Sequence, residues 1–205
     1  MAKGRYARPP IHGVGITDVE HRVATDPIYK VWVKMLQRCY SKKYQEKQPT
    51  YIGCLVCPEW HRYSAFREWV LRQPWQGRYL DKDLLHPGNT LYAPERCVFV
   101  DRLTNNLLHD HAAARGDHPL GVTFDKSRGL FSAKCNTIDS RTANLGRFSN
   151  PLDAHAAWQR EKAKVIRQVA NLQTDERVAL ALEGRAKKLD DDRTLGLVTE
   201  DHKNA

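Results

Sequence analysis

The sequence predicts an α+β fold in two parts, on three observations. Between Trp32 and Cys39, four apolar side chains recur at the spacing of one helix face. Residues 80–100 carry a hairpin pattern, with two strand-like runs on either side of a Pro-Gly-Asn turn. Residues 120–148 hold three more strand patterns, and a helix-start signal follows them at once. A chain of 205 residues is long enough for two modest cores.

The N-terminal part begins with an arm and then becomes helical. Residues 1–24 are rich in Gly, Pro, Arg and His without a regular period, which predicts an extended basic arm. A helix is expected from Pro27, because Asp26 is a good N-cap and proline suits the first helical position. A short strand or turn is expected at residues 51–57 and a second helix at 63–71.

The predicted hairpin closes the first module, which spans residues 25–113. Its strands are expected at residues 80–85 and 97–100, and a short helix through Leu103 and Leu108 follows. The small residues at 112–117 predict a linker.

The C-terminal part, residues 117–170, is predicted as a three-stranded antiparallel sheet packed on one helix. The strands are expected at residues 120–124, 130–135 and 143–148, with the helix from Pro151 to about residue 170. One face of the sheet should cover the helix, while the other presents polar side chains. The tail, residues 171–205, is expected to be a loosely attached helix or a disordered extension.

The basic charge is concentrated in the predicted folded parts. The formal net charge is +9 at pH 7, and residues 1–170 carry 27 basic and 16 acidic side chains, against six and eight in the tail. A basic body predicts a polyanionic partner, because each Lys or Arg that replaces a counterion on a phosphate adds salt-dependent affinity.

Membrane and disulfide-rich classes are not expected. No run approaches the roughly 18 consecutive apolar residues of a spanning helix. The start of the chain holds no apolar leader stretch, and its five cysteines are an odd number. The expected setting is a reducing cytoplasm, which for a phage-encoded protein is that of the bacterial host.

Four short strings in the C-terminal part occur in the order and spacing of a known family. They are Leu-Gly-Val-Thr-Phe from residue 120, Phe-Ser-Ala-Lys from 131, Leu-Gly-Arg-Phe from 145 and Asp-Ala-His-Ala-Ala-Trp from 153. This part resembles the APETALA-type (ethylene-response-factor-like) DNA-binding domain. The resemblance implies a sheet that lies in the major groove of double-stranded DNA, in a module that also accompanies phage homing endonucleases.

Six basic side chains are the candidates for contact with DNA phosphates or bases. A major groove of about 12 Å admits a twisted β-sheet, and Arg can read guanine with two hydrogen bonds. The candidates are Lys126, Arg128, Lys134, Arg141 and Arg147 in the C-terminal part, with Arg96 in the first module. Trp158 is expected to pack in the core.

A second set of strings lies in the first module. They are Met-Leu-x-Arg-Cys-Tyr from residue 35, Val-Cys-Pro-Glu-Trp from 56, Leu-Asp-Lys-Asp from 80, Gly-Asn-x-x-Tyr from 88 and Pro-Glu-x-Cys from 94. Residues 29–108 resemble the phage-type HNH homing endonucleases, a family built on a ββα (His-Me finger) module that holds one divalent metal. The resemblance implies metal-dependent hydrolysis of DNA phosphodiesters, with Mg²⁺ as the expected ion.

The implied active site departs from the family at two positions. Asp81 stands at the metal-binding Asp, but Lys82 replaces the catalytic His and Arg96 an Asn. The metal candidates are Asp81, Asp83, Asn105 and Asn106, and the catalytic candidates are Asp81, Lys82, Asp83 and Asn105. A lysine acts as a base only when its pKa falls by several units, which neighbouring carboxylates oppose. Alternative bases are His61, His86, His109 and His111.

These departures leave two further interpretations. One is a catalytically inert DNA-binding protein that regulates or occludes phage or host DNA. The other is a protein that binds a host protein through its acidic tail. A structural zinc is not expected, because Cys54 and Cys57 have ligand spacing without a second Cys-x-x-Cys pair, and buried free thiols are expected instead.

Overall fold

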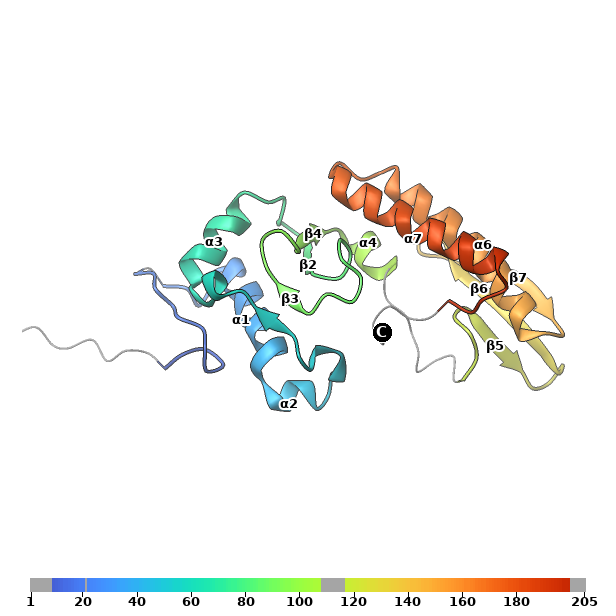
Figure 1. The fold of residues 1–205 in the computed structure, drawn as a ribbon, viewed down its shortest axis with the longest axis horizontal. Coiled ribbons are helices and arrows are strands. Elements are labelled where there is room, and N and C mark those ends of the chain that lie inside the picture. The colour runs from blue at the N-terminus through green and yellow to red at the C-terminus, as the bar shows by residue number, and fades with distance from the viewer. Residues whose placement is uncertain (1–8, 21, 108–116, 200–205) are drawn as a thin grey trace, which may run out of the picture. The chain divides into compact units, whose positions relative to one another are not determined.

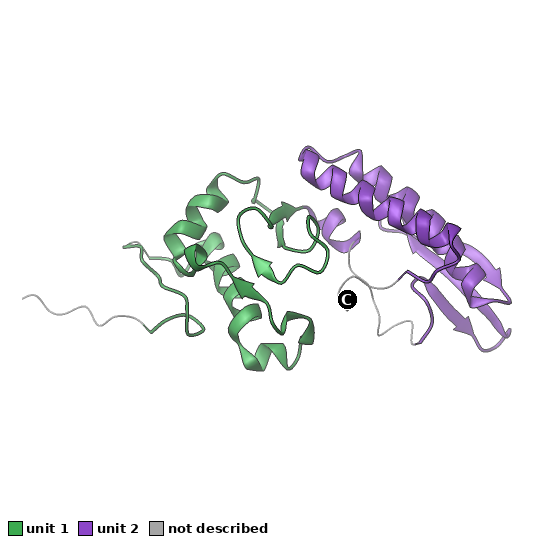
Figure 2. Ribbon diagram, in the orientation of Figure 1, with its two compact units in different colours: residues 1–100 green, residues 101–205 purple. Residues whose placement is uncertain are grey.

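Figure 1 shows the fold in a computed structural model, which describes residues 9–20, 22–107 and 117–199. The chain divides into two compact units, Met1–Val100 and Asp101–Ala205 (Figure 2). Helices and strands occur in both units, which confirms the expected mixture of helix and sheet. None of the helices within the described ranges is both long and apolar enough to cross a membrane.

The first unit is built from short elements. Its helices are α1 (Pro27–Tyr40), α2 (Lys42–Gln45) and α3 (Tyr63–Leu71), with 3-10 turns at Pro49–Tyr51 and Pro58–His61. Its strands are β1 (Leu55–Val56), β2 (Tyr79–Asp81), β3 (Leu91–Tyr92) and β4 (Val98–Val100). β1 pairs with β3 in parallel, and β2 pairs with β4 in antiparallel fashion.

Helix α1 begins where the sequence predicts. The Asp26 carboxylate accepts a hydrogen bond from the Ile28 amide at 2.9 Å, and Pro27 takes the first helical position. Trp32 is fully buried, and its indole N–H donates to the Trp60 carbonyl at 2.7 Å. The largest members of the core around it are Trp32, Met35, Leu36, Trp60, Tyr63, Phe66, Tyr92 and Phe99.

The segment before α1 packs onto the first unit. The Ile16 amide donates to the His61 carbonyl, and Asp18 accepts hydrogen bonds from the Ser64 amide at 2.9 Å and the Ser64 hydroxyl at 2.6 Å. Gly15 lies so close to α1 that a Cβ there would fall 2.4 Å from Leu36. The expected extended arm is therefore wrong for residues 11–18, because these contacts fix them, and its first eight residues lie outside the described part.

The predicted hairpin is present in a shorter form, as the β2–β4 pair. The strand expected at residues 80–85 ends at Asp81. The reason is that the Asp81 carboxylate accepts hydrogen bonds from the amides of Asp83 and Leu84, at 2.8 and 2.6 Å, and turns the chain. The parallel β1–β3 pair was not expected.

The second unit contains the three-stranded sheet. Its strands are β5 (Val122–Asp125), β6 (Leu130–Asn136) and β7 (Thr142–Phe148), in the antiparallel order β5-β6-β7. Helix α6 (Pro151–Ala170) follows β7 and packs on the sheet through a core of Val122, Ala133 and Ala154. This confirms the predicted three-stranded antiparallel sheet with a helix packed on it.

One glycine allows the sheet and α6 to approach closely. Gly121 has a φ of +75°, and a Cβ there would lie 1.9 Å from the Trp158 ring. Trp158 stacks on His155 with ring centroids 5.4 Å apart, and His155 Nδ1 donates to the Leu120 carbonyl at 2.9 Å. Trp158 is thus a packing residue, as expected.

The tail forms a helix, as in the first of the two expected alternatives, but the expected loose attachment is wrong, because the helix packs on α6. Helix α7 (Glu176–Thr194) lies alongside α6 (Figure 1) and buries Val178, Leu182, Ala186 and Leu189. The chain then returns to α6, where the Thr199 amide donates to His155 Nε2 at 3.0 Å and Gln159 donates to the Thr199 hydroxyl at 2.9 Å. The tail is therefore firmly attached up to Thr199.

Helix α4 (Arg102–Leu107) belongs to the second unit, although the sequence assigned it to the first module. Lys162 on α6 donates to the Leu107 carbonyl at 2.8 Å, and Gln173 donates to the Thr104 hydroxyl at 3.2 Å. Most of the linker expected at residues 112–117 lies outside the described residues.

Candidate functional site

The three-stranded sheet has one face on α6 and the other face away from it. Val122 and Ala133, which are paired across β5 and β6, lie on the helix side. Side chains alternate along a strand, and directly paired residues share a face. Thr123, Ser132 and Arg147 therefore form a row on the opposite face.

Two further rows continue this opposite face. Lys134 is paired with Asn144, and Asn136 with Thr142. We call the six exposed side chains of the three rows the polar sheet face: Thr123, Lys134, Asn136, Thr142, Asn144 and Arg147. This set holds two cations, two amides and two hydroxyls, all of which can donate hydrogen bonds to a ligand.

A β-bulge determines which side chains of β7 belong to this face. The pairing shifts between Ala133 and Lys134, which leaves Leu145 as an extra residue on β7. Asn144 and Arg147 are three positions apart, so in a regular strand they would point to opposite faces. Gly146 accommodates the bulge with a φ of +121°, and its amide donates to Asn144 Oδ1 at 3.1 Å. Leu145 packs on the helix side, and both polar residues stay on the polar sheet face.

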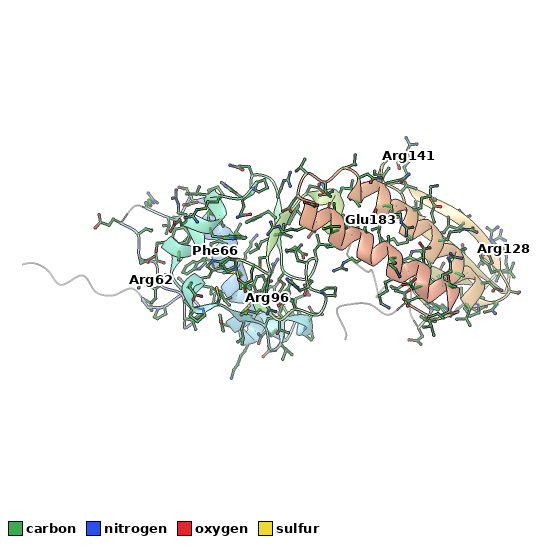
Figure 3. All side chains as sticks on the ribbon, turned by 45° about the horizontal axis from the view of Figure 1, so that its top comes forward. Arg62, Phe66, Arg96, Arg128, Arg141 and Glu183 are labelled. Carbon is green, nitrogen blue, oxygen red and sulfur yellow. The ribbon has the colours of Figure 1, made fainter. Side chains whose placement is uncertain are left out.

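The other predicted cations of the C-terminal part lie in the turns. Lys126 and Arg128 are in the β5–β6 turn and Arg141 in the β6–β7 turn; Figure 3 labels the two arginines, which point away from the ribbon. Arg128 pairs with Asp125 at 3.0 Å and Arg141 with Asp139 at 3.1 Å. These carboxylates partly neutralise the two arginines.

The charge of Asp125 is fixed by its neighbours. Hydrogen bonds from Ser127 and from the Arg128 guanidinium lower the pKa of Asp125 to about 2. It is therefore ionised at neutral pH and remains a partner of Arg128. Lys134 and Arg147, by contrast, form no ion pair with another described residue, so their charges are available to a ligand.

The sequence predicted the two cations of the polar sheet face but not its uncharged Thr and Asn side chains. Lys134 and Arg147 were predicted, whereas Thr123, Asn136, Thr142 and Asn144 were not singled out. Alternation along β6 could have identified Asn136. The β7 residues depend on the bulge, and Gly146 is its one sign in the sequence.

The second candidate site is the loop between β2 and β4, where Lys82 is only 7% exposed. Its ammonium donates to Asp83 Oδ1 and to the Asn89 carbonyl, both at 2.5 Å. It also lies 6.0 Å from the centre of the Tyr92 ring. Lys82 therefore acts as a buried cation that joins two parts of the loop.

Asn89 holds the same loop from the other side. Its Nδ2 donates to the carbonyls of Lys82 at 2.9 Å and Leu91 at 2.7 Å. Its Oδ1 accepts from the Leu91 amide at 3.1 Å and from Arg96 at 3.2 Å. Arg96, labelled in Figure 3, is thus a loop contact whose side chain is still 45% exposed.

The residues of this loop do not fit a divalent metal well. Asp81 Oδ1 accepts from two backbone amides, and Asp83 Oδ1 is held by the Lys82 ammonium, whose charge would repel a metal ion. Asn105 and Asn106 lie on α4 in the second unit. Within the described ranges, no group of three or more His, Cys, Asp or Glu is placed to hold a metal ion.

The histidines considered as alternative bases are not gathered at Asp81 by any described contact. His61 Nε2 lies 3.2 Å from the Tyr40 hydroxyl, and His86 is exposed. His109 and His111 lie outside the described residues.

All five cysteines are buried and free of disulfides. Burial raises the pKa of Cys39 to about 12 and that of Cys57 to about 11, so both thiols stay protonated at neutral pH. They pack as small apolar side chains, as expected.

No protein-family model matches this chain, and no curated protein or solved structure does either.

Proposed function

We propose that the protein binds double-stranded DNA through the polar sheet face. The observation that carries this proposal is the composition of that face, whose six exposed side chains are all Lys, Arg, Asn or Thr. Arg pairs with the acceptors of guanine, Asn pairs with adenine, and a Thr methyl contacts thymine in the major groove. The net charge of +9 favours the approach to a polyanion.

The cations at the sheet divide into two groups in this proposal. Lys134 and Arg147 lie on the face itself without a carboxylate partner, so they contact bases or phosphates directly. Arg128 and Arg141 lie in the turns and already pair with Asp125 and Asp139. We expect them to contribute less to affinity, because they must exchange one anionic partner for another.

The test is the affinity of a double variant for a labelled DNA duplex. Lys134→Ala with Arg147→Ala should weaken binding at least tenfold and lower the slope of log affinity against log salt concentration by about 2, since each phosphate contact contributes about 0.9. The matched control is Arg160→Ala with Lys164→Ala, which removes the same charge from exposed positions of α6. Equal losses in the two variants, or no loss in either, would contradict the proposal.

A metal-dependent nuclease is the second candidate. One observation that favours it is that the paired strands β2 and β4 are followed by α4, which is the strand–strand–helix order of an HNH module. Another is Asn89, whose side chain holds the loop between the two strands by a hydrogen bond to the Lys82 carbonyl. Against it stands Lys82, paired with Asp83. We therefore propose DNA binding without cleavage as the better supported function, acting on phage or host DNA in a reducing cytoplasm.

Supercoiled plasmid distinguishes the two candidates. With Mg²⁺ or Mn²⁺ at low salt, we expect retarded but intact plasmid, as with EDTA. Metal-dependent nicking that disappears in Asp81→Ala would instead establish the nuclease.

A further inference from the structure

A second strongly basic surface of the first unit comprises α1, α2 and the turn that follows α2, far along the chain from the sheet. Five lysines there are exposed: Lys30, Lys34, Lys42, Lys43 and Lys47. We call them the α1–α2 lysine surface. Between residues 27 and 48 the chain carries six basic side chains and a single acidic one, Glu46.

The packing of α1 directs two of these lysines to solvent. Lys30 and Lys34 flank Trp32 by two positions on either side, and two positions correspond to about 200° around a helix. Trp32 is fully buried in the core of the unit. The two lysines therefore occupy the side of α1 opposite the core, and α2 adds Lys42 and Lys43 directly after the helix ends at Tyr40.

The charge of this surface is not neutralised by ion pairs among the residues that the structure describes. None of the five lysines forms an ion pair with another described residue. On the two long helices of the second unit the situation is different, because Lys164, Lys187 and Lys188 pair with Glu161, Asp191 and Asp192. The α1–α2 lysine surface thus stands out as a group of uncompensated cations.

Such a group is unfavourable for the isolated fold. Like charges four residues apart on a helix, as at Lys30 and Lys34, repel each other and slightly destabilise it. The same lysines become favourable when a polyanion replaces their counterions. Lysine ammonium groups act as flexible point charges, which suits phosphates rather than base edges.

We infer that the α1–α2 lysine surface binds the phosphate backbone of DNA without reading its sequence. This inference rests on the proposed function of the polar sheet face and adds a second contact region, in the other unit, to the same ligand. The polar sheet face would then provide sequence preference, and the lysine surface would provide non-specific affinity.

The experiment compares two fourfold variants of the full chain with equal loss of charge. The first carries Lys30→Gln, Lys34→Gln, Lys42→Gln and Lys43→Gln. The control carries Arg72→Gln, Lys164→Gln, Arg177→Gln and Lys187→Gln, which are exposed and already paired with carboxylates. Affinity for a labelled duplex is measured by fluorescence anisotropy over a range of salt concentrations, with far-UV circular dichroism as the check of folding.

The first variant should bind at least tenfold more weakly than the control, and its salt slope should be smaller by about 3.6, at about 0.9 for each of the four lost phosphate contacts. Its ratio of affinities for different duplex sequences should remain that of the wild type. If the two variants bind alike while the polar-sheet-face variant loses affinity, the lysine surface is not a DNA contact and the proposed function stands. If the wild type binds no duplex, both proposals are wrong. Two double variants, one on each helix, repeat the comparison if the fourfold variant does not fold.

Discussion

A lysine that is almost wholly buried must have partners for its ammonium, and Lys82 has two within the loop that it holds. The ammonium bonds to Asp83, whose side chain is 34% exposed, and to the Asn89 carbonyl. Because the Asp83 carboxylate is partly solvated, we interpret the pair as a contact that holds the loop in place. The role that these contacts give to Lys82 is therefore to stabilise the loop.

Replacing Lys82 should destabilise the first unit. Lys82→Met keeps the length of the side chain but removes the ammonium that donates to the Asn89 carbonyl and to Asp83. The free energy of unfolding should fall by about 2 kcal/mol, the usual cost of an unsatisfied buried polar group. Urea unfolding followed by tryptophan fluorescence measures it, with the exposed Lys43→Met as the control, expected within about 0.5 kcal/mol of the wild type. Equal stability of the two variants would show that the Lys82 contacts do not stabilise the first unit.

At the scale of elements, the joint between the sheet and α6 depends on Gly121. Gly121 and Gly129 both have positive φ, of +75° and +65°, but only Gly121 would bring a Cβ against another side chain. The two positions therefore separate backbone strain from steric conflict.

The alanine variants of these glycines should differ in stability. Gly129→Ala should cost about 1 kcal/mol, because it adds only the strain of a left-handed backbone. Gly121→Ala should cost a further 1–3 kcal/mol or so, since Trp158 must move out of its packed position. Thermal unfolding followed by far-UV circular dichroism compares them. A similar loss in both would mean that Trp158 can shift without cost.

The elements that were predicted correctly are those with local signals. Asp26-Pro27 and Asn150-Pro151 marked the starts of α1 and α6, because a cap and a proline act on their own turn of helix. The β1–β3 pair was missed, since each strand has two residues and its partner is far away in sequence. In the candidate site, the cations were predictable from residue type. The place of Asn144 was not, because it depends on a bulge that only the pairing with β6 reveals.

At the scale of the whole molecule, the two units have separate cores. Trp32, Phe66 and Tyr92 belong to the core of the first unit, whereas Val122, Ala133 and Ala154 form the core at the sheet. Four of the five tryptophans lie in residues 1–100, and the two longest helices lie in residues 101–205. Fluorescence and far-UV circular dichroism therefore report mainly on different units.

Unfolding of the full chain in urea should show two transitions that these probes weight differently. Gly121→Ala should move the transition seen by circular dichroism and leave the midpoint seen by fluorescence nearly unchanged. Coincident curves for both probes, displaced together by this substitution, would show instead that the two units unfold as one.

The parallel pairing of β1 with β3 also affects the order in which parts of the protein fold. Leu55 can pair only after Leu91 has been synthesised. Val122 pairs with Ala133, which is only eleven positions further along the chain. Contacts between distant positions form slowly because a long loop must close first, and contacts between near positions form quickly. The β5–β6 pair should therefore form before the β1–β3 pair in a refolding chain, although β1 is the first of these strands to leave the ribosome.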